Sequence, residues 1–376
     1  MKTEIPKVEL TEYLYDRASR QHIPLGGTFE LSPVCNFSCR MCYVRQTPQQ
    51  VKAAPRPILQ PEDWLRIAEE AKACGMLYLL LTGGEPFLWP GFWPLYEKLS
   101  SMGFVISINT NGSLIGPEQA ERLREIPPRK LSISLYGTSD ETYEKLCGVR
   151  DGFRRTDRAI TLLQEAGITV QLSCSLTPYN AGDLEKITAY AEKKHLELTV
   201  ASYMFPPVRR DGAAVGENEG RFSAEEAGAY RLRVYELQNS PEQYRKFLEA
   251  VCSGYGEPPG LENSCQDDLS GKIRCRAGRA SFLITWDGRM TPCGMLPEPW
   301  TDVKQLPFGE AWEELRTISG RLKLSGLCDT CPDRKLCHPC AAMAYAETGS
   351  VSGTPRYLCE ATREMHRIAR EILCKP

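Results

Sequence analysis

Three cysteines, Cys35, Cys39 and Cys42, stand within eight residues of one another in the stretch ELSPVCNFSCRMCYVR. A structural zinc site closes its coordination shell with four side chains, whereas this stretch offers three thiols and all four histidines lie elsewhere. Three thiolates leave one position of a metal centre open, and an open position is where a substrate binds. We therefore predict a catalytic metal centre. The alternative is three half-buried core cysteines, because cysteine is often a small apolar residue.

A second candidate stretch is LTGGEP, in which Gly83, Gly84 and Glu85 follow the apolar run MLYLLL. If this run and the one before Cys35 are parallel strands, both stretches lie at the strands' carboxyl ends, where barrel-like α/β enzymes have their active sites. Two glycines let the backbone approach a ligand closely, and a carboxylate receives an ammonium group. Taken alone, a glycine pair after a strand is equally well explained as a common turn.

Length, charge and composition limit the class of protein. At about 150 residues per domain, 376 residues suggest two or three domains. A net charge of -2 gives no basic surface for nucleic acid or anionic lipid. The chain has no run of eighteen apolar residues, and its start is too polar for a signal peptide, so we predict a cytoplasmic protein without a membrane span. Sixteen cysteines in a reducing compartment indicate metal binding more than disulfides.

Between residues 28 and 202, short apolar runs alternate with helical patterns. The candidate strands are TFEL (28–31), MLYLLL (76–81), FVISI (104–108), LSISL (131–135), ITVQLSCSL (168–176) and LELTVA (196–201). Their nearly continuous apolar character fits a covered parallel sheet, and Trp64, Ile67 and Ala71 recur at helical spacing between two of them. Six strand–helix units predict an α/β fold with a partial (β/α)6 barrel, short of the eight units of a closed barrel.

The chain divides into four regions by sequence character. They are an N-terminal extension (1–25), the barrel (26–203), a bridging region with a helix from about Ser223 to Gln238 (204–255), and a small loop-rich domain (256–376). In the last region Asp287-Gly288 marks a β-hairpin whose second run leads to Cys293, and the chain ends in a helix. We expect this small domain to be held by metal rather than by an apolar core.

The two N-terminal motifs together resemble those of the radical S-adenosylmethionine (radical SAM) enzymes. CNFSCRMC has the CxxxCxxC spacing of that family, TGGEP looks like its second-strand motif, and the resemblance covers roughly residues 25 to 202. It implies that Cys35, Cys39 and Cys42 bind three irons of a [4Fe-4S] cluster and that S-adenosylmethionine chelates the fourth. It also implies one-electron cleavage to a 5'-deoxyadenosyl radical that takes hydrogen from the substrate, with a flavodoxin or ferredoxin as electron donor.

The same resemblance suggests residues that contact S-adenosylmethionine. The stretch Gly83–Glu85 would hold its methionine end, and Ser134 in SISLYG resembles the family's polar contact to ribose or carboxylate. Many members carry an aromatic residue just before the last cysteine, where this chain has Met41, and Tyr43 would instead present its backbone to the adenine. Arg150 in GVRDGF is a candidate carboxylate partner by its charge, and a solvated surface arginine is the alternative.

The C-terminal cysteines resemble the SPASM extension of such enzymes, which holds two auxiliary [4Fe-4S] clusters. By position in that pattern, the first cluster is bound by Cys275, Cys293 and Cys340, and the second by Cys328, Cys331, Cys337 and Cys359. Cys265 is the candidate for the fourth ligand of the first cluster, with Cys252 as the alternative. Two residues rather than three separate Cys337 from Cys340, which departs from the pattern. Zinc is the other interpretation, because CxxC pairs beside His338 also occur in zinc ribbons.

SPASM enzymes mostly modify peptides or proteins, so the leading hypothesis is a maturase that forms a thioether or carbon–carbon cross-link in a ribosomally made peptide. Sulfatase maturation is the nearest competitor, but Gly294 follows Cys293 where those enzymes usually have an aspartate base. Thirty-four residues precede Cys35, too few for the leader-binding domain of many relatives. We therefore expect a separate leader-binding protein, or a small substrate, as in a dehydrogenase or a tetrapyrrole-modifying decarboxylase.

Two further readings stay open at this point. Tyr203 and Arg209, after the sixth predicted strand, are candidates for substrate contact, and a packed loop explains them equally. A non-enzymatic electron carrier or metal-stabilised binding module is the alternative from a different class. We disfavour the non-enzymatic alternative because it gives no role to Glu85 or to the barrel pattern.

Overall fold

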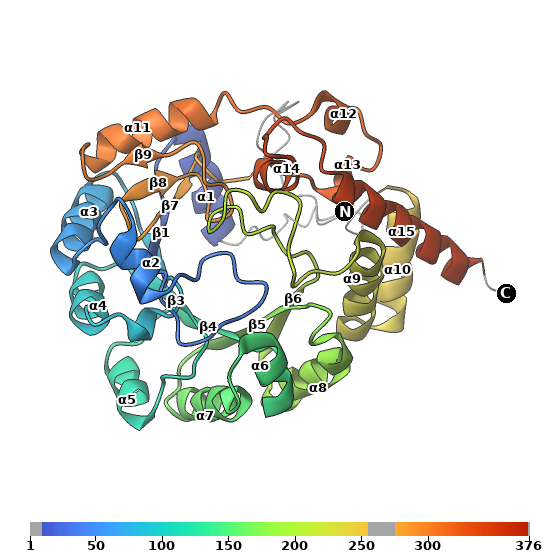
Figure 1. Ribbon diagram of the computed structural model, residues 1–376, viewed down its shortest axis with the longest axis horizontal. Coiled ribbons are helices and arrows are strands. Elements are labelled where there is room, and N and C mark those ends of the chain that lie inside the picture. Colours follow the sequence, from blue (N-terminus) through green and yellow to red (C-terminus); the bar gives the residue numbers. More distant parts are fainter. Residues whose placement is uncertain (1–9, 255–274, 375–376) are drawn as a thin grey trace, which may run out of the picture.

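The computed structural model describes residues 10–254 and 275–374, and nine strands within these ranges form one sheet (Figure 1). The strands are β1 (Gly26–Glu30), β2 (Tyr78–Thr82), β3 (Val105–Thr110), β4 (Lys130–Ser134), β5 (Val170–Ser175), β6 (Glu197–Ala201), β7 (Ser281–Ile284), β8 (Arg289–Thr291) and β9 (Thr301–Asp302). Strands β1 to β6 pair in parallel in chain order, and β6 and β9 are the two edges. The sheet is therefore an open arc, and the predicted partial barrel is confirmed.

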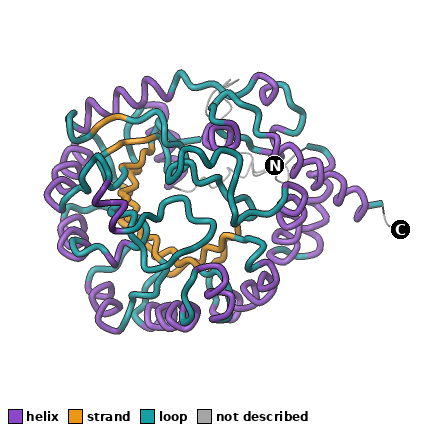
Figure 2. Tube along the Cα trace, in the orientation of Figure 1, coloured by secondary structure: helices purple, strands orange, loops and turns teal. Residues whose placement is uncertain are grey.

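Helices cover the outer side of this arc (Figures 1 and 2). They include α3 (Pro61–Ala73), α4 (Phe92–Ser101), α5 (Pro117–Glu125), α7 (Gly152–Glu165) and α8 (Leu184–Lys194). The same part of the chain also contains α2 (Pro48–Ala53), the short η1 (Pro86–Leu88), α6 (Asp140–Cys147) and the short η2 (Ala181–Asp183). Burial alternates along the strands: in β2, Leu79 and Leu81 are buried in the main core with Trp64 of α3, while Leu80 is only half-buried. The helices thus meet one face of each strand, and the loops after the strands gather inside the arc (Figure 2).

The C-terminal region departs from the expected separate domain. Strand β7 pairs in parallel with β1, and β7, β8 and β9 pair in antiparallel fashion, so the predicted hairpin at Asp287-Gly288 is confirmed but extends the barrel sheet. Phe282 and Ile284, together with Phe308 and Leu315 of α11 (Phe308–Ser319), belong to the main apolar core. The expectation of a metal-held domain fails for this stretch because its apolar side chains have a core to join.

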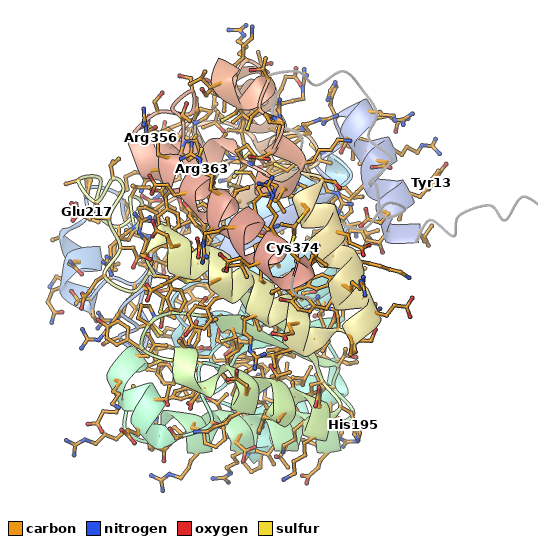
Figure 3. The ribbon with its side chains drawn as sticks, turned by 90° about the vertical axis from the view of Figure 1, so that its right-hand side faces the viewer. Tyr13, His195, Glu217, Arg356, Arg363 and Cys374 are labelled. Atoms are coloured by element: carbon orange, nitrogen blue, oxygen red, sulfur yellow. The ribbon has the colours of Figure 1, made fainter. Side chains whose placement is uncertain are left out.

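A second apolar core lies at the other edge of the sheet, among α9 (Ala224–Gln238), α10 (Pro241–Cys252) and α15 (Arg356–Leu373). Figure 3 shows α15 lying across α9 and α10. Helix α9 matches its prediction, whereas α10 was missed, although a capping box of Ser240 and Gln243 marks its start. On the predicted face of α15, Met365 is buried and Ile372 is 39% exposed.

The remaining elements are α1 (Leu10–Gln21), α12 (Gly326–Asp329), α13 (Arg334–Cys337) and α14 (Ala341–Thr348). Helix α1 packs against the sheet where the ring of Tyr15 stacks on that of Tyr78, 5.6 Å apart. In the described ranges, no helix combines the length and the apolar character that a membrane crossing requires.

Candidate active site

A cavity of about 360 Å³ lies at the carboxyl ends of the barrel strands. Polar side chains at the strand ends line one part of it, among them Thr82, Asn109, Asn111, Ser134, Ser173 and Ser175. Apolar side chains from the loops line another part, namely Phe37, Met41, Met204, Phe205 and Met295, with Tyr203 beside them. All three cysteines of the CxxxCxxC stretch line the same cavity, as do Tyr43, Gly83 and Gly84. The fold thus brings most of the predicted site residues together.

The cysteine loop presents its thiols to backbone and side-chain donors. The Phe37 amide lies 3.3 Å from Cys35 Sγ and the Arg45 amide 3.3 Å from Cys42 Sγ, while Asn111 Nδ2 lies 3.7 Å from Cys35 Sγ. Burial, with smaller contributions from the nearby carboxyl of Glu85 and from the other two thiols, raises the pKa of Cys35 to about 12. Thiols buried together need a cation to stay deprotonated, so three thiolates with N–H donors on their sulfurs fit a metal cluster.

The loop is held from behind by the end of α6. The Ser38 amide donates to the Cys147 carbonyl at 2.8 Å, and the Arg40 amide donates to the Leu146 carbonyl at 3.0 Å. Cys147 is fully buried, as its interpretation as a core cysteine predicts. These two hydrogen bonds flank Cys39 in the chain and fix its backbone against α6.

The glycine pair serves the backbone of the cysteine loop. A Cβ on Gly83 would lie 2.4 Å from the Ser32 carbonyl oxygen, and one on Gly84 would lie 2.4 Å from that of Val34. Gly83 has a φ of 152°, which favours glycine. The Gly84 amide also donates to the Ser32 carbonyl at 2.7 Å. The pair therefore lets the ends of β1 and β2 meet directly before Cys35, in addition to lining the cavity.

Glu85 is buried and does not itself line the cavity. Its carboxylate accepts from Thr110 Oγ1 at 2.8 Å, from the Asn111 amide at 2.8 Å and from the Phe87 amide at 3.1 Å. Burial raises its pKa to about 7, against the effect of these donors. Glu85 thus fixes Asn111, whose side chain reaches Cys35. Sequence analysis missed Asn111, although the polar run INTNG after the third apolar run was a signal.

The other predicted S-adenosylmethionine contacts divide into two groups. Ser134 ends β4 and lines the cavity, and Tyr43 lines it beside Cys42. Arg150 does not line it: its side chain is 87% exposed, and its guanidinium pairs with Glu144 at 2.9 Å. Arg150 therefore lies at the surface, as the alternative interpretation of a solvated arginine expects.

Residues 29–191 match the profile of the Radical SAM superfamily. They form a radical SAM domain. The chain is 25% identical to an AdoMet-dependent heme synthase of Methanosarcina barkeri, over 85% of this chain and 92% of the synthase. It is 24% identical to the sporulation killing factor maturation protein SkfB of Bacillus subtilis, over 78% of this chain and 64% of SkfB.

The fold is also that of a solved structure, native anSMEcpe with bound AdoMet and the Cp18Cys peptide. That structure superimposes with a TM-score of 0.67 at 18% identity, covering 93% of this chain and 98% of anSMEcpe. Residues 29–191 therefore belong to the superfamily whose members bind S-adenosylmethionine and a [4Fe-4S] cluster. The similarity to anSMEcpe shows that the chain shares its fold.

Outside the radical SAM domain, one group of thiols lies next to the cavity. Burial, with smaller contributions from the neighbouring thiols of Cys293 and Cys275, raises the pKa of Cys340 to about 11. The Met343 amide lies 3.4 Å from Cys340 Sγ. Cys293 and Cys340 pack in one apolar cluster with Phe205, which also lines the cavity. The structure thus brings together the three described cysteines that were assigned to the first auxiliary cluster.

The second group holds Cys328, Cys331, Cys337 and Cys359. Burial, with smaller contributions from the thiols of Cys359 and Cys328, raises the pKa of Cys337 to about 11. Burial likewise raises the pKa of Cys328, which lies near Cys359 and Cys331. Three of the four come from α12, α13 and α15, and α12 and α13 have only four residues each. The four cysteines assigned to the second auxiliary cluster are therefore neighbours.

Two observations bear on the alternatives for these groups. Cys265 lies outside the described residues, whereas Cys252 ends α10 and packs in the second core, near Arg370 and Cys374 of the α15 end. Among described side chains, no three His, Cys, Asp or Glu residues converge as ligands of one metal ion would.

The two candidate substrate contacts also separate. Tyr203 lines the cavity, and its hydroxyl donates to Glu347 Oε1 at 2.7 Å. Arg209 does not line it and is buried in an ion pair with Glu30 at 2.8 Å, so its interpretation as a substrate contact is corrected to that of a packed residue.

Proposed function

We propose that this radical SAM enzyme removes a hydrogen atom from a peptide and completes an oxidative cross-link, a thioether or a carbon–carbon bond. The observation that carries the proposal is that one cavity is lined both by the CxxxCxxC thiols and by Met295 and Phe205, which adjoin Cys293 and Cys340. A substrate in that cavity lies between two thiol groups, each of which suits an iron–sulfur cluster.

The residues that line the cavity have different roles in this proposal. Cys35, Cys39 and Cys42 would hold the cluster that, with S-adenosylmethionine, supplies the one-electron chemistry. The Gly83–Gly84 backbone and Ser134 would hold the cosubstrate, because they line the same cavity. Asn111 donates to Cys35 Sγ and keeps that thiolate oriented. No carboxylate, histidine or lysine occurs among the described lining residues, so we assign no catalytic base.

The electron balance of the reaction requires an electron acceptor, and the thiol group of Cys275, Cys293 and Cys340 could hold it. Removal of one hydrogen atom leaves a substrate radical, and bond formation then releases a proton and one more electron. An auxiliary cluster on Cys275, Cys293, Cys340 and Cys265 would accept that electron. A second cluster on Cys328, Cys331, Cys337 and Cys359 would pass it on to an acceptor such as an oxidised flavodoxin or ferredoxin. The product thus loses two hydrogen atoms overall.

The lining of the cavity favours peptide side chains over a polyanionic substrate. Phe37, Met41, Met204 and Met295 offer apolar contact, and Arg45 is the single cation among the described lining residues. Methionine-rich surfaces adapt to varied side chains. SkfB, by its name a maturation protein, and anSMEcpe, solved with a peptide, agree with this choice.

The test is release of 5'-deoxyadenosine by anaerobically reconstituted, reduced protein, with and without short peptides encoded beside its gene. We expect a peptide to stimulate release at least about tenfold and to lose two hydrogen atoms in the mass spectrum. A Cys35→Ala variant, incubated in parallel, should do neither. Cleavage that no neighbouring peptide stimulates, with no change in peptide mass, would contradict the peptide proposal and leave the radical SAM assignment standing.

A second candidate is oxidative decarboxylation of a small molecule. It is favoured by the similarity to the heme synthase, which extends over 92% of that protein. Arg45 would then receive a substrate carboxylate, since its Nε is buried without a hydrogen-bond partner beside the cavity. The same assay with an iron tetrapyrrole carboxylic acid distinguishes the two candidates, because decarboxylation releases carbon dioxide and cross-linking does not.

A further inference from the structure

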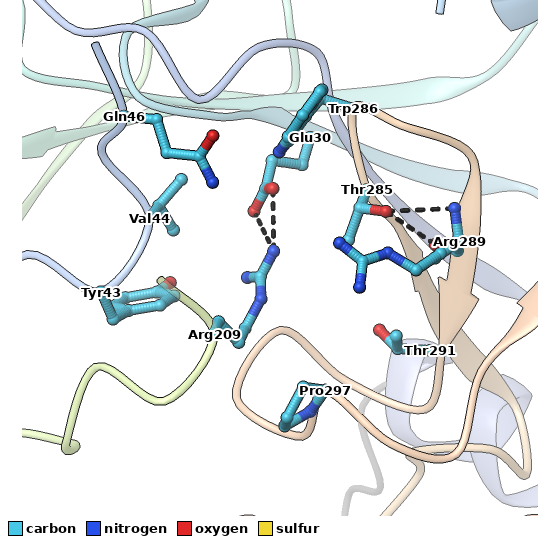
Figure 4. A pocket seen from close by; sticks show the side chains of 10 residues that line it. All are labelled: Glu30, Tyr43, Val44, Gln46, Arg209, Thr285, Trp286, Arg289, Thr291 and Pro297. Carbon is cyan, nitrogen blue, oxygen red and sulfur yellow. Dashed lines mark hydrogen bonds and ion pairs between the residues drawn. The ribbon is translucent and has the colours of Figure 1, made fainter. Parts of the chain in front are cut away.

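A buried ion pair lies between the radical SAM domain and the loop that carries Cys293. Arg209 Nη2 contacts Glu30 Oε1 at 2.8 Å and Oε2 at 2.9 Å (Figure 4). Arg209 Nη1 donates to the Gly294 carbonyl at 2.8 Å. The two side chains are 11% and 2% exposed. Separating the two side chains would leave a buried charge without compensation, so the pair keeps its geometry.

This one side chain reaches segments next to both thiol groups. Glu30 is the last residue of β1, which leads into the cysteine loop, and Gly294 directly follows Cys293. The Arg209 guanidinium also lies over the ring of Tyr43, 5.8 Å from its centroid, and Tyr43 directly follows Cys42. Arg209 therefore connects the Cys42 side of the cavity to the Cys293 side.

Other roles for Arg209 fit the surroundings less well. Two cations lie here, and each has its own carboxylate: Arg289 pairs with Asp287 at 2.9 Å, and Arg209 pairs with Glu30. The Arg209 charge is thus already balanced within the protein. The cavity that Arg209 lines with Tyr43 and Thr291 measures about 30 Å³, which suits a water molecule and not a substrate (Figure 4). A contribution to stability alone would need only the ion pair with Glu30. The additional hydrogen bond to the Gly294 carbonyl ties the guanidinium to the loop that carries Cys293.

We propose that Arg209 is a positioning residue that fixes the Cys293 thiol, and with it the first auxiliary cluster, relative to the cavity. The inference rests on the proposed function. The planar guanidinium places its N–H groups on Glu30 and Gly294 at the same time, whereas a lysine ammonium keeps the charge without the fork. Removal of an electron from the substrate requires that the acceptor keep a fixed position. A looser Cys293 loop should therefore lower product formation while cosubstrate cleavage continues.

The test is Arg209→Lys in the cluster-loaded protein. We expect 5'-deoxyadenosine release to stay within about twofold of the parent, and product formed per 5'-deoxyadenosine to fall at least about tenfold. Two readouts do not depend on turnover. Hydrogen exchange of the amides in residues 293–296 should accelerate, and the electron paramagnetic resonance signal of one reduced cluster should change while the others stay as they are.

The control makes the same replacement in a comparable ion pair. Arg56 contacts both carboxylate oxygens of Asp302, at 2.9 and 2.7 Å, and neither residue lines the cavity. Arg56→Lys should leave product yield, exchange of residues 293–296 and all cluster signals unchanged. If Arg209→Lys fails to fold, Glu30→Gln serves instead, because it retains the shape and one acceptor oxygen.

The outcomes separate this proposal from the proposed function. Parent-like exchange, spectra and product yield in Arg209→Lys would overturn the positioning role. A parent protein without auxiliary-cluster signals would overturn the proposed function. In that case exchange of residues 293–296 would still decide whether Arg209 fixes the loop.

Discussion

The two cysteine-rich regions of this enzyme are built differently. Cys35, Cys39 and Cys42 stand on a loop whose backbone is bound to α6 and to the β2 end, and Phe37 and Met41 of this loop pack with Tyr143 and Leu146 of α6 in a small apolar cluster. The group of Cys328 to Cys359 stands largely on very short helices, with α15 as its one long element. The first region has a scaffold of backbone hydrogen bonds and apolar packing, whereas the short helices of the second join the second core through Leu336 of α13. If both regions hold the proposed clusters, loss of metal should inactivate the first and loosen the second.

The largest effect is expected for the first region. Replacing Cys35, Cys39 and Cys42 together by alanine should reduce 5'-deoxyadenosine release by at least about a thousandfold, because the one-electron chemistry loses its cluster. The free energy of unfolding should fall by no more than about 2 kcal/mol, since the loop keeps its backbone hydrogen bonds. Activity assays and chemical denaturation measure the two quantities.

Iron analysis adds a control to this variant. If the parent holds the three proposed clusters, the variant should retain about two-thirds of the iron. Complete loss of iron would mean that the C-terminal thiols hold no cluster of their own, and retained cleavage would remove the catalytic assignment of the loop.

The second region should show the opposite pattern. Replacing Cys328 and Cys331 by serine removes two of four neighbouring thiols, and the surrounding short helices cannot form a core of their own. We expect residues 326–340 to become sensitive to proteases and the variant to lose about 3 kcal/mol of stability or more. Cosubstrate cleavage should fall less than about tenfold, because the radical SAM domain folds around its own core. Protease resistance of this stretch equal to that of the parent would break the comparison.

A smaller effect tests how the first scaffold works. In Gly84→Ala, the new Cβ would meet the Val34 carbonyl oxygen at 2.4 Å, so β1 and β2 must separate just before Cys35. We expect a loss of about 1 to 3 kcal/mol in stability and weaker binding of S-adenosylmethionine, measured by calorimetry on the cluster-loaded protein. Gly182→Ala provides the control, because nothing lies within 4 Å of its added Cβ. Unchanged cosubstrate affinity in Gly84→Ala would show that the close approach of the two strands is not needed for the site.

Much of this comparison was predictable from sequence. The six apolar runs predicted β1 to β6 because parallel strands covered by helices are buried along their length. The spacing of Cys35, Cys39 and Cys42 predicted that they act together, and all three line the same cavity. The resemblance supplied the C-terminal cysteine groups, and their ligand sets stay predictions.

What failed depended on contacts between distant segments. Nothing in SFLIT indicates that β7 pairs with β1 rather than with a strand of a separate domain. Arg150 and Arg209 carry the same charge in similar loops, and only packing decides that one is solvated and the other is buried against Glu30. Asn111 was missed because its role depends on Glu85, which lies 26 positions away in the chain.

The smallest effect is expected for Cys252→Ser, and it sharpens the comparison most. Cys252 is half-buried at the end of α10, among the side chains of the second core and near Arg370. Serine at this position removes a partly buried sulfur that belongs to neither of the two C-terminal thiol groups. We therefore expect the free energy of unfolding to fall by about 1 kcal/mol or less, and the iron content to equal that of the parent. Cys265→Ser, made in parallel, should lower the iron content by up to one cluster. The reverse result would make Cys252 the fourth ligand beside Cys275, Cys293 and Cys340, and the end of α10 would then have to approach the cavity.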